Sequence, residues 1–192
     1  MAKPILTPEN QIQRLNRLLH RVSQFENLPL DTLLKRPTPT SWNLLEVLEH
    51  LSISYDLYRD KIATVLRESE MDSEGPWTHK VGLWQTFVIE GQRPKGKKRP
   101  FKMKTLKRFE PLLPKTGMAV EDATMVFQRF SECHNTLKAQ LLASRLKQLR
   151  RTRLTSAIGP IVRFYLPEAF EFLICHMERH MVQIDGILST DG

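Results

Sequence analysis

The chain has 192 residues, 41% of them hydrophobic and 26% charged, which excludes disorder throughout and favours one domain over residues 1–192. The formal net charge of +8 favours acidic partners without distinguishing nucleic acid, lipid and small anions. The two cysteines, Cys133 and Cys175, form no CxxC pair, and no apolar run approaches the roughly 18 residues of a membrane span. We therefore expect a cytoplasmic protein that neither depends on disulfides nor enters a membrane.

The first predicted helix begins at Thr7, a capping residue that is followed by Pro8 and Glu9. Apolar residues then keep helical spacing to about Asn27, and His20 lies outside their face. Three prolines within residues 28–40 predict a connecting loop rather than a continuous helix.

The second predicted helix opens at Asn43 and runs to about Glu70. Asn43 with Glu46 three residues later is close to a capping box. The apolar residues of its core face are Leu44, Val47, Leu48, Leu51, Tyr55, Tyr58, Ile62 and Val65. His50 lies at the edge of this face, and taken alone it is typical of a hydrogen-bonded core or boundary histidine.

Regular spacing fails between about residues 71 and 118, although residues 81–89 fit either a short helix or an extended segment. An insertion of about residues 90–118 includes the basic stretch 92–108, which carries nine Lys or Arg residues and no acid. Such a stretch is typical of a solvated loop, and the alternative is a loop that binds an anion. His79 precedes it, and its spacing assigns it to no site.

The third predicted helix runs from about Val120 to Arg150, and its last turn is expected to be basic, which suits the helix dipole. Cys133 lies on its core face as a small apolar filler, and His134, one position further round, is expected outside. Residues 152–165 form the crossover into the final helix.

The final helix, from Pro167 onwards, carries the strongest functional signal. Its apolar face consists of residues at spacings of three and four, namely Ala169, Leu173, His176, His180, Ile184 and Ile187. His176 and His180 therefore lie one above the other, where two buried imidazoles need a shared partner such as a metal ion. The alternative is two hydrogen-bonded interior histidines. Cys175 points about 100° away and is not counted as a ligand, and Arg179 is expected at the surface or in a dimer contact.

A divalent ion needs at least a third protein ligand. Four amphipathic helices with loops of unequal length predict an all-α four-helix bundle with a long basic loop between the second and third helices. Bundle metal sites use side chains from facing helices, so His50 can join His176 and His180. Three imidazoles leave an open, Lewis-acidic site suited to zinc or nickel. Glu46 serves either as the helix cap or as a partner that orients His50.

Two motifs resemble the DinB/YfiT superfamily. Residues 42–51, Trp-Asn-Leu-Leu-Glu-Val-Leu-Glu-His-Leu, are similar to its W-S-x-x-E-V-L-x-H-L opening of the second helix. Residues 176–184, His-Met-Glu-Arg-His-Met-Val-Gln-Ile, resemble its H-x-x-R-H-x-x-Q-I final helix, and Gly159 matches the glycine ahead of it. The resemblance covers the whole chain in order. The chain departs from the pattern at Asn43, where Ser or Thr is usual, and at Ser156, where a His-Pro pair is frequent.

The resemblance implies a DinB-like bundle that holds one divalent metal on His50, His176 and His180, commonly as a homodimer. Members of the family include S-transferases that use low-molecular-weight thiols, such as bacillithiol, mycothiol or glutathione, and proteins described as metal-dependent hydrolases. The leading hypothesis is thus a metal-dependent enzyme that activates a thiol or water for S-transfer or hydrolysis on a small molecule. No catalytic residue is assigned. The alternative is a non-enzymatic binding or stress-associated protein whose basic loop docks an acidic partner. For nucleic acid as that partner, the positive charge is the only support.

Overall fold

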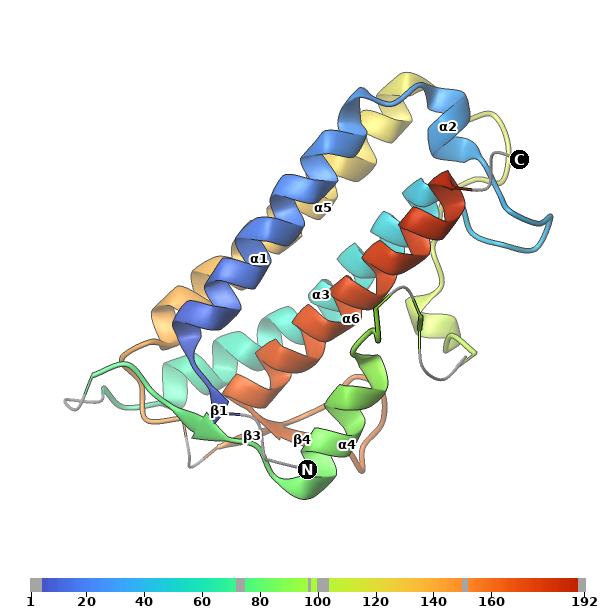
Figure 1. The fold of residues 1–192 in the computed structure, drawn as a ribbon. Helices are drawn as coiled ribbons and strands as arrows, with labels where there is room; N and C mark the ends of the chain where they lie inside the picture. Colours follow the sequence, from blue (N-terminus) through green and yellow to red (C-terminus); the bar gives the residue numbers. More distant parts are fainter. Residues whose placement is uncertain (1–4, 72–74, 97, 100–103, 150–151, 190–192) are drawn as a thin grey trace.

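The computed structural model describes residues 5–71, 75–96, 98–99, 104–149 and 152–189. This described chain is mostly helical, as predicted, and its long helices α1 (Pro8–Ser23), α3 (Leu44–Glu68), α5 (Val120–Ser144) and α6 (Leu166–Leu188) run alongside one another (Figure 1). Helix α3 packs against α5 and α6, and α1 packs against the same two helices from the other side of the core. None of the described helices is both long enough and apolar enough to cross a membrane.

The predicted starts of the first two long helices are confirmed by their caps. The Thr7 hydroxyl accepts a hydrogen bond from the Asn10 amide at 3.4 Å, and a 3₁₀ turn, η1 (Gln24–Asn27), follows α1. Asn43 Oδ1 accepts from the Glu46 amide at 2.8 Å while Glu46 Oε2 accepts from the Asn43 amide at 3.0 Å, which completes a capping box. This cap fixes the entry of α3 and hence the height of His50 along the helix.

Residues 28–40 connect two long helices and form no continuous helix, as predicted, although they contain a short helix, α2 (Leu30–Leu34), that buries Leu33 in the core. The predicted end of the third helix is wrong. Helix α5 ends at Ser144 rather than near Arg150. The Arg145 carbonyl accepts a hydrogen bond from the Trp77 amide at 3.3 Å instead of one from the next turn of a helix. The last turn therefore contains no basic residue. Arg150 lies outside the described residues.

The long connection between α3 and α5 contains regular structure. Strand β2 (His79–Lys80) pairs antiparallel with β1 (Ile5–Leu6). Residues 81–89 were predicted to be either helical or extended, and most of them lie in helix α4 (Leu83–Gln92). Helix α4 packs on α6 (Figure 1), and a 3₁₀ turn, η2 (Lys107–Phe109), follows further on. The crossover before α6 holds a small antiparallel hairpin of β3 (Arg153–Thr155) and β4 (Arg163–Tyr165), which the sequence did not indicate.

A buried ion cluster fastens α1 and the end of α4 to α6. Glu171, only 1% exposed, accepts from Arg14 Nη1 at 2.6 Å and from Arg93 Nη2 at 2.7 Å. Burial by itself would raise the pKa of Glu171, but the charges of the two arginines outweigh it and lower the pKa. Because Arg93 is the first cation of the basic stretch, this contact also fixes where that stretch leaves α4.

We expect Glu171→Gln to lower the free energy of unfolding by roughly 1.5–3 kcal/mol, because buried Arg14 and half-buried Arg93 lose a shared charged acceptor and keep only Glu178 and Glu90. Because the pKa is lowered in the folded state, this stabilisation is fully present above the ordinary carboxyl pKa and is lost as pH falls from there through the lower pKa of the folded protein. Urea unfolding at neutral pH measures the effect. Arg145→Gln, which removes the exposed pair with Glu9, is the control and is expected to cost less than about 1 kcal/mol. Equal losses in the two variants would contradict this account.

Candidate metal centre

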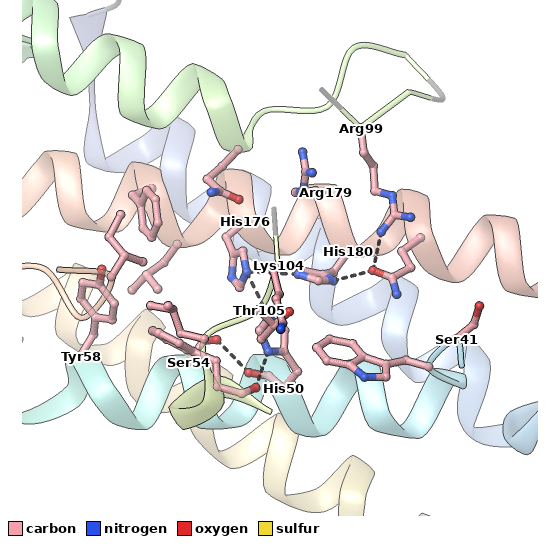
Figure 2. A pocket seen from close by; sticks show the side chains of 18 of the residues that line it. Ser41, His50, Ser54, Tyr58, Arg99, Lys104, Thr105, His176, Arg179 and His180 are labelled. Carbon is pink, nitrogen blue, oxygen red and sulfur yellow. Dashed lines mark hydrogen bonds between the residues drawn. The ribbon is translucent and has the colours of Figure 1, made fainter. Parts of the chain in front are cut away.

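Three histidines from two helices meet at the interface of α3 and α6. His50 lies on α3, and His176 and His180 lie one turn apart on α6. The Nε2 atom of His176 is 3.2 Å from Nε2 of His50 and 3.1 Å from Nε2 of His180 (Figure 2). One nitrogen from each ring lies within 4.8 Å of the others, so the three predicted ligands are brought together.

The tautomers of the two outer histidines follow from their second nitrogens. His50 Nδ1 lies 2.6 Å from the carbonyl oxygen of Phe109, which can only accept, so this nitrogen carries the hydrogen. His180 Nδ1 lies 3.0 Å from Gln183 Oε1, and the same oxygen also accepts from Arg99 Nη1 at 2.6 Å. Because a guanidinium can only donate, the Arg99 contact fixes this atom as the amide oxygen, and His180 Nδ1 is therefore the donor. Both Nε2 atoms therefore present lone pairs to the cluster.

His176 cannot satisfy this arrangement with its own hydrogen. If its Nε2 carries the proton, it can donate to only one of the two facing lone pairs, and its buried Nδ1 has no hydrogen-bond partner among the described residues. If its Nδ1 carries the proton, three lone pairs face one another. A cation at the centre would satisfy all three Nε2 atoms, so the donor set fits a metal ion better than it fits a hydrogen-bonded histidine cluster.

The electrostatic environment keeps the imidazoles neutral. Burial, and then the neighbouring charges of the other imidazoles and of Arg179, lowers the pKa of His176 and His180 well below the ordinary value. Burial also lowers the pKa of His50, partly offset by its hydrogen bond to Phe109. A neutral imidazole is the form that binds metals.

The histidines line a cavity of about 630 Å³. Its apolar wall includes Trp42, Leu106, Phe109, Ile158, Phe172 and Leu173. Its polar wall includes Ser54, Tyr58 and Gln183, and its cations are Arg99, Lys104 and Arg179 (Figure 2).

Arg179 corrects one prediction, because it is 7% exposed and lines the cavity instead of lying at the surface. Arg99 of the basic stretch lies over this part of α6 and donates to Gln183 Oε1 on the same helix (Figure 2). Helical periodicity places Arg179 off the apolar face but does not specify what packs against it.

Glu46 acts as a cap rather than as a partner of His50. Its carboxylate closes the capping box and accepts from Arg36 Nη2 at 2.8 Å. The actual partner of His50 is a backbone carbonyl of η2, and a carbonyl distant in sequence leaves no signal in the residue pattern. Gln183, the partner of His180, did carry one, because it follows His180 by three residues on the same helix.

The remaining candidates lie elsewhere. His79 Nε2 binds Glu168 Oε1 at 3.0 Å, and His20 is exposed, as predicted. Cys175 is buried against Arg14 and Glu171 and is not part of the cluster, also as predicted. His134 was expected outside the core, and this is wrong: it is 0% exposed on α5, because α1 packs over that face of the helix.

Comparison with known proteins identifies one match. The family described as the DinB superfamily matches residues 11–184, a span that holds all three histidines. No curated protein and no solved structure matches the chain.

Burial lowers the pKa of His134 from the ordinary 6.5 of a histidine to about 4. Between these two values His134 is protonated in the unfolded chain and neutral in the folded chain. The free energy of unfolding therefore falls as pH drops from about 6.5 towards about 4. The expected slope from this residue is about 1.4 kcal/mol per pH unit. In chemical denaturation between pH 7 and 4.5, His134→Leu should flatten the pH dependence relative to the parent. The exposed-residue control His20→Leu should leave it unchanged, and identical profiles for both variants would refute the assignment.

Proposed function

Because the chain belongs to the DinB superfamily and its three histidines converge at one buried point, we propose that it is a metal-dependent enzyme acting on a small molecule. The observation that carries this proposal is the set of Nε2 contacts of 3.2 and 3.1 Å around His176. We further propose one domain over residues 1–192 with the four-helix topology expected of a DinB-like protein. The packing of α1, α3, α5 and α6 supports that topology.

His50, His176 and His180 would hold one divalent ion, and imidazole ligands suit zinc or nickel. A bound ion of this kind would supply a Lewis acid that lowers the pKa of a thiol or a water molecule at neutral pH. Three protein ligands leave coordination positions for that group, as catalytic rather than structural sites do. The proposed reaction is S-transfer with a low-molecular-weight thiol, or hydrolysis.

The surrounding residues prepare the site for that chemistry. The Phe109 carbonyl and Gln183 hold the outer imidazoles with their Nε2 lone pairs inward, so little reorganisation is needed on binding. Trp42, Phe172 and Leu173 form an apolar wall that excludes water and accepts an apolar part of a substrate. Tyr58 also lines the cavity, and its hydroxyl is hydrogen-bonded to Ser156, the position at which the family motif often has His-Pro.

The basic stretch favours the enzyme over the alternative of a protein that docks an acidic macromolecule. Arg93 and Arg99 bind Glu171 and Gln183 within the chain, and Arg99 and Lys104 line the cavity beside the histidines. Arg99 and Lys104 thus belong to the cavity with the histidines, and Arg93 makes a structural contact. Homodimer formation and a cytoplasmic location belong to this proposal only through the family resemblance and the composition.

We expect the protein, purified without a histidine tag, to contain about one divalent ion per chain by elemental analysis. The double variant His176→Ala/His180→Ala should contain almost none, because two of three ligands are missing. His20→Ala, which removes an exposed histidine, is the matched control and should retain the parent's content. No metal in the parent, even after incubation with zinc or nickel, would overturn the proposal.

The same preparations test the reaction class. Thiol-transfer and hydrolysis screens should show activity that a chelator removes and that the ion restores. Added ion should also raise the melting temperature of the parent, because binding at a hundredfold excess over the dissociation constant adds about 2.7 kcal/mol to the free energy of unfolding. The double variant should gain nothing from the ion.

A further inference from the structure

The two outer histidines of the cluster differ in how their tautomers are fixed. His50 Nδ1 faces the backbone carbonyl of Phe109 at 2.6 Å, and a carbonyl oxygen can only accept a hydrogen bond. His180 Nδ1 faces the side-chain amide of Gln183 at 3.0 Å, and an amide has an acceptor at one end and a donor at the other. The tautomer of His180 is therefore fixed only if the orientation of this amide is fixed as well.

The orientation of the Gln183 amide decides whether His180 can bind an ion. With Oε1 towards Nδ1, the single imidazole hydrogen lies on Nδ1, and the Nε2 lone pair faces the cluster. Rotation of the amide by half a turn would bring its N–H group to Nδ1, which would then accept, and the hydrogen would lie on Nε2 instead. An Nε2 atom that carries the hydrogen has no lone pair for a metal ion.

Arg99 holds the amide in the first of these orientations. Its Nη1 donates to Gln183 Oε1 at 2.6 Å (Figure 2). Because a guanidinium has no acceptor, the rotated amide would set one donor against another. Among the described residues, only Arg99 and His180 form hydrogen bonds with this amide. The residue that decides the orientation thus comes from the basic stretch, far in sequence from helix α6.

We propose that Arg99 is a positioning residue of the metal centre, which acts through Gln183 to select the tautomer of His180 whose Nε2 binds the ion. By linkage, the bound ion strengthens the contact between Arg99 and α6 by the same factor. This inference rests on the proposed function and names a control on that site. Its sign is distinctive. The positive charge of Arg99 by itself opposes a cation nearby, so charge alone predicts tighter ion binding when Arg99 is removed, whereas tautomer selection predicts weaker binding.

The tautomer of His180 is measured in chelator-treated protein at neutral pH, from the NMR shifts of its two ring nitrogens. The signals are assigned by their loss in His180→Ala. We expect the parent to carry the hydrogen on Nδ1. Arg99→Met removes the donor and should move the hydrogen towards Nε2, because the Gln183 amide is then free to rotate. Arg99→Lys, whose side chain also only donates, should restore the parent's shifts.

Zinc affinity, measured by competition with a chromophoric chelator, follows on the same samples. Arg99→Met should weaken zinc binding by about three- to tenfold, which is less than the roughly ten- to hundredfold loss typical when a direct partner of a ligand is removed. Arg99→Lys should bind zinc as the parent does. The control Lys98→Met removes a neighbouring exposed charge that does not line the cavity, and should change zinc affinity by less than about twofold.

Gln183→Glu separates tautomer selection from a structural role of Arg99. A carboxylate accepts in either orientation, so His180 then keeps its hydrogen on Nδ1 without help from Arg99. Adding Arg99→Met to Gln183→Glu should therefore cause no further loss of zinc affinity. If Arg99 only anchors the basic stretch to α6, the second substitution would cause the same loss in both backgrounds.

An unchanged His180 tautomer in Arg99→Met would overturn the proposal, as would unweakened zinc binding or an equal loss in the Gln183→Glu background. The NMR measurement needs no ion, and this keeps the two proposals apart. A parent that binds zinc but whose tautomer does not depend on Arg99 would refute the positioning role alone. A parent that takes up no zinc, but whose tautomer does depend on Arg99, would refute the metal-dependent enzyme and leave the control of the tautomer standing.

Discussion

The structure depends on a conflict at the buried interface of α3 and α6. Two imidazoles are held by the Phe109 carbonyl and by Gln183 so that their Nε2 lone pairs face a third imidazole, which has only one hydrogen to offer. A core that packed for stability alone would fill this point with apolar side chains. The geometry of the three rings is explained if the site binds a cation. The caps and the packing of both helices determine where along α3 and α6 the three rings meet.

The segment between α3 and α5 completes this site from outside the long helices. It is fastened to α6 at two places, through Arg93 at the buried Glu171 and through Arg99 at Gln183. Its described residues Arg99, Lys104 and Phe109 line the cavity, and the Phe109 carbonyl orients His50. A stretch whose composition suggests a solvated loop thus contributes side chains to the cavity that holds the histidines.

The sequence predicted those parts of the site that depend on local periodicity. The i, i+4 pair on α6 and the edge position of His50 on α3 follow from helical geometry, and the two motifs pointed to the same three residues. The caps at Thr7 and Asn43 were also predicted, because each capping side chain binds an amide only three residues further along the chain.

Features set by contacts distant in sequence were missed or mistaken. His134 is buried because α1 packs against α5, and helix α5 ends where the Arg145 carbonyl binds the Trp77 amide. Arg179 lines the cavity together with Arg99, which is distant in sequence. The Phe109 carbonyl is backbone, and no residue type marks it. Periodicity specifies the face on which a side chain lies, whereas what covers that face is decided by tertiary structure.

The central claim is that the three Nε2 atoms share one divalent ion. A crystal of the zinc-loaded protein, measured on both sides of the zinc absorption edge, tests it most directly. The account predicts one strong anomalous peak about 2.0–2.1 Å from Nε2 of His50, His176 and His180, with further coordination open to the cavity. A zinc peak at other residues, or none at this cluster in crystals that take up the ion elsewhere, would contradict it.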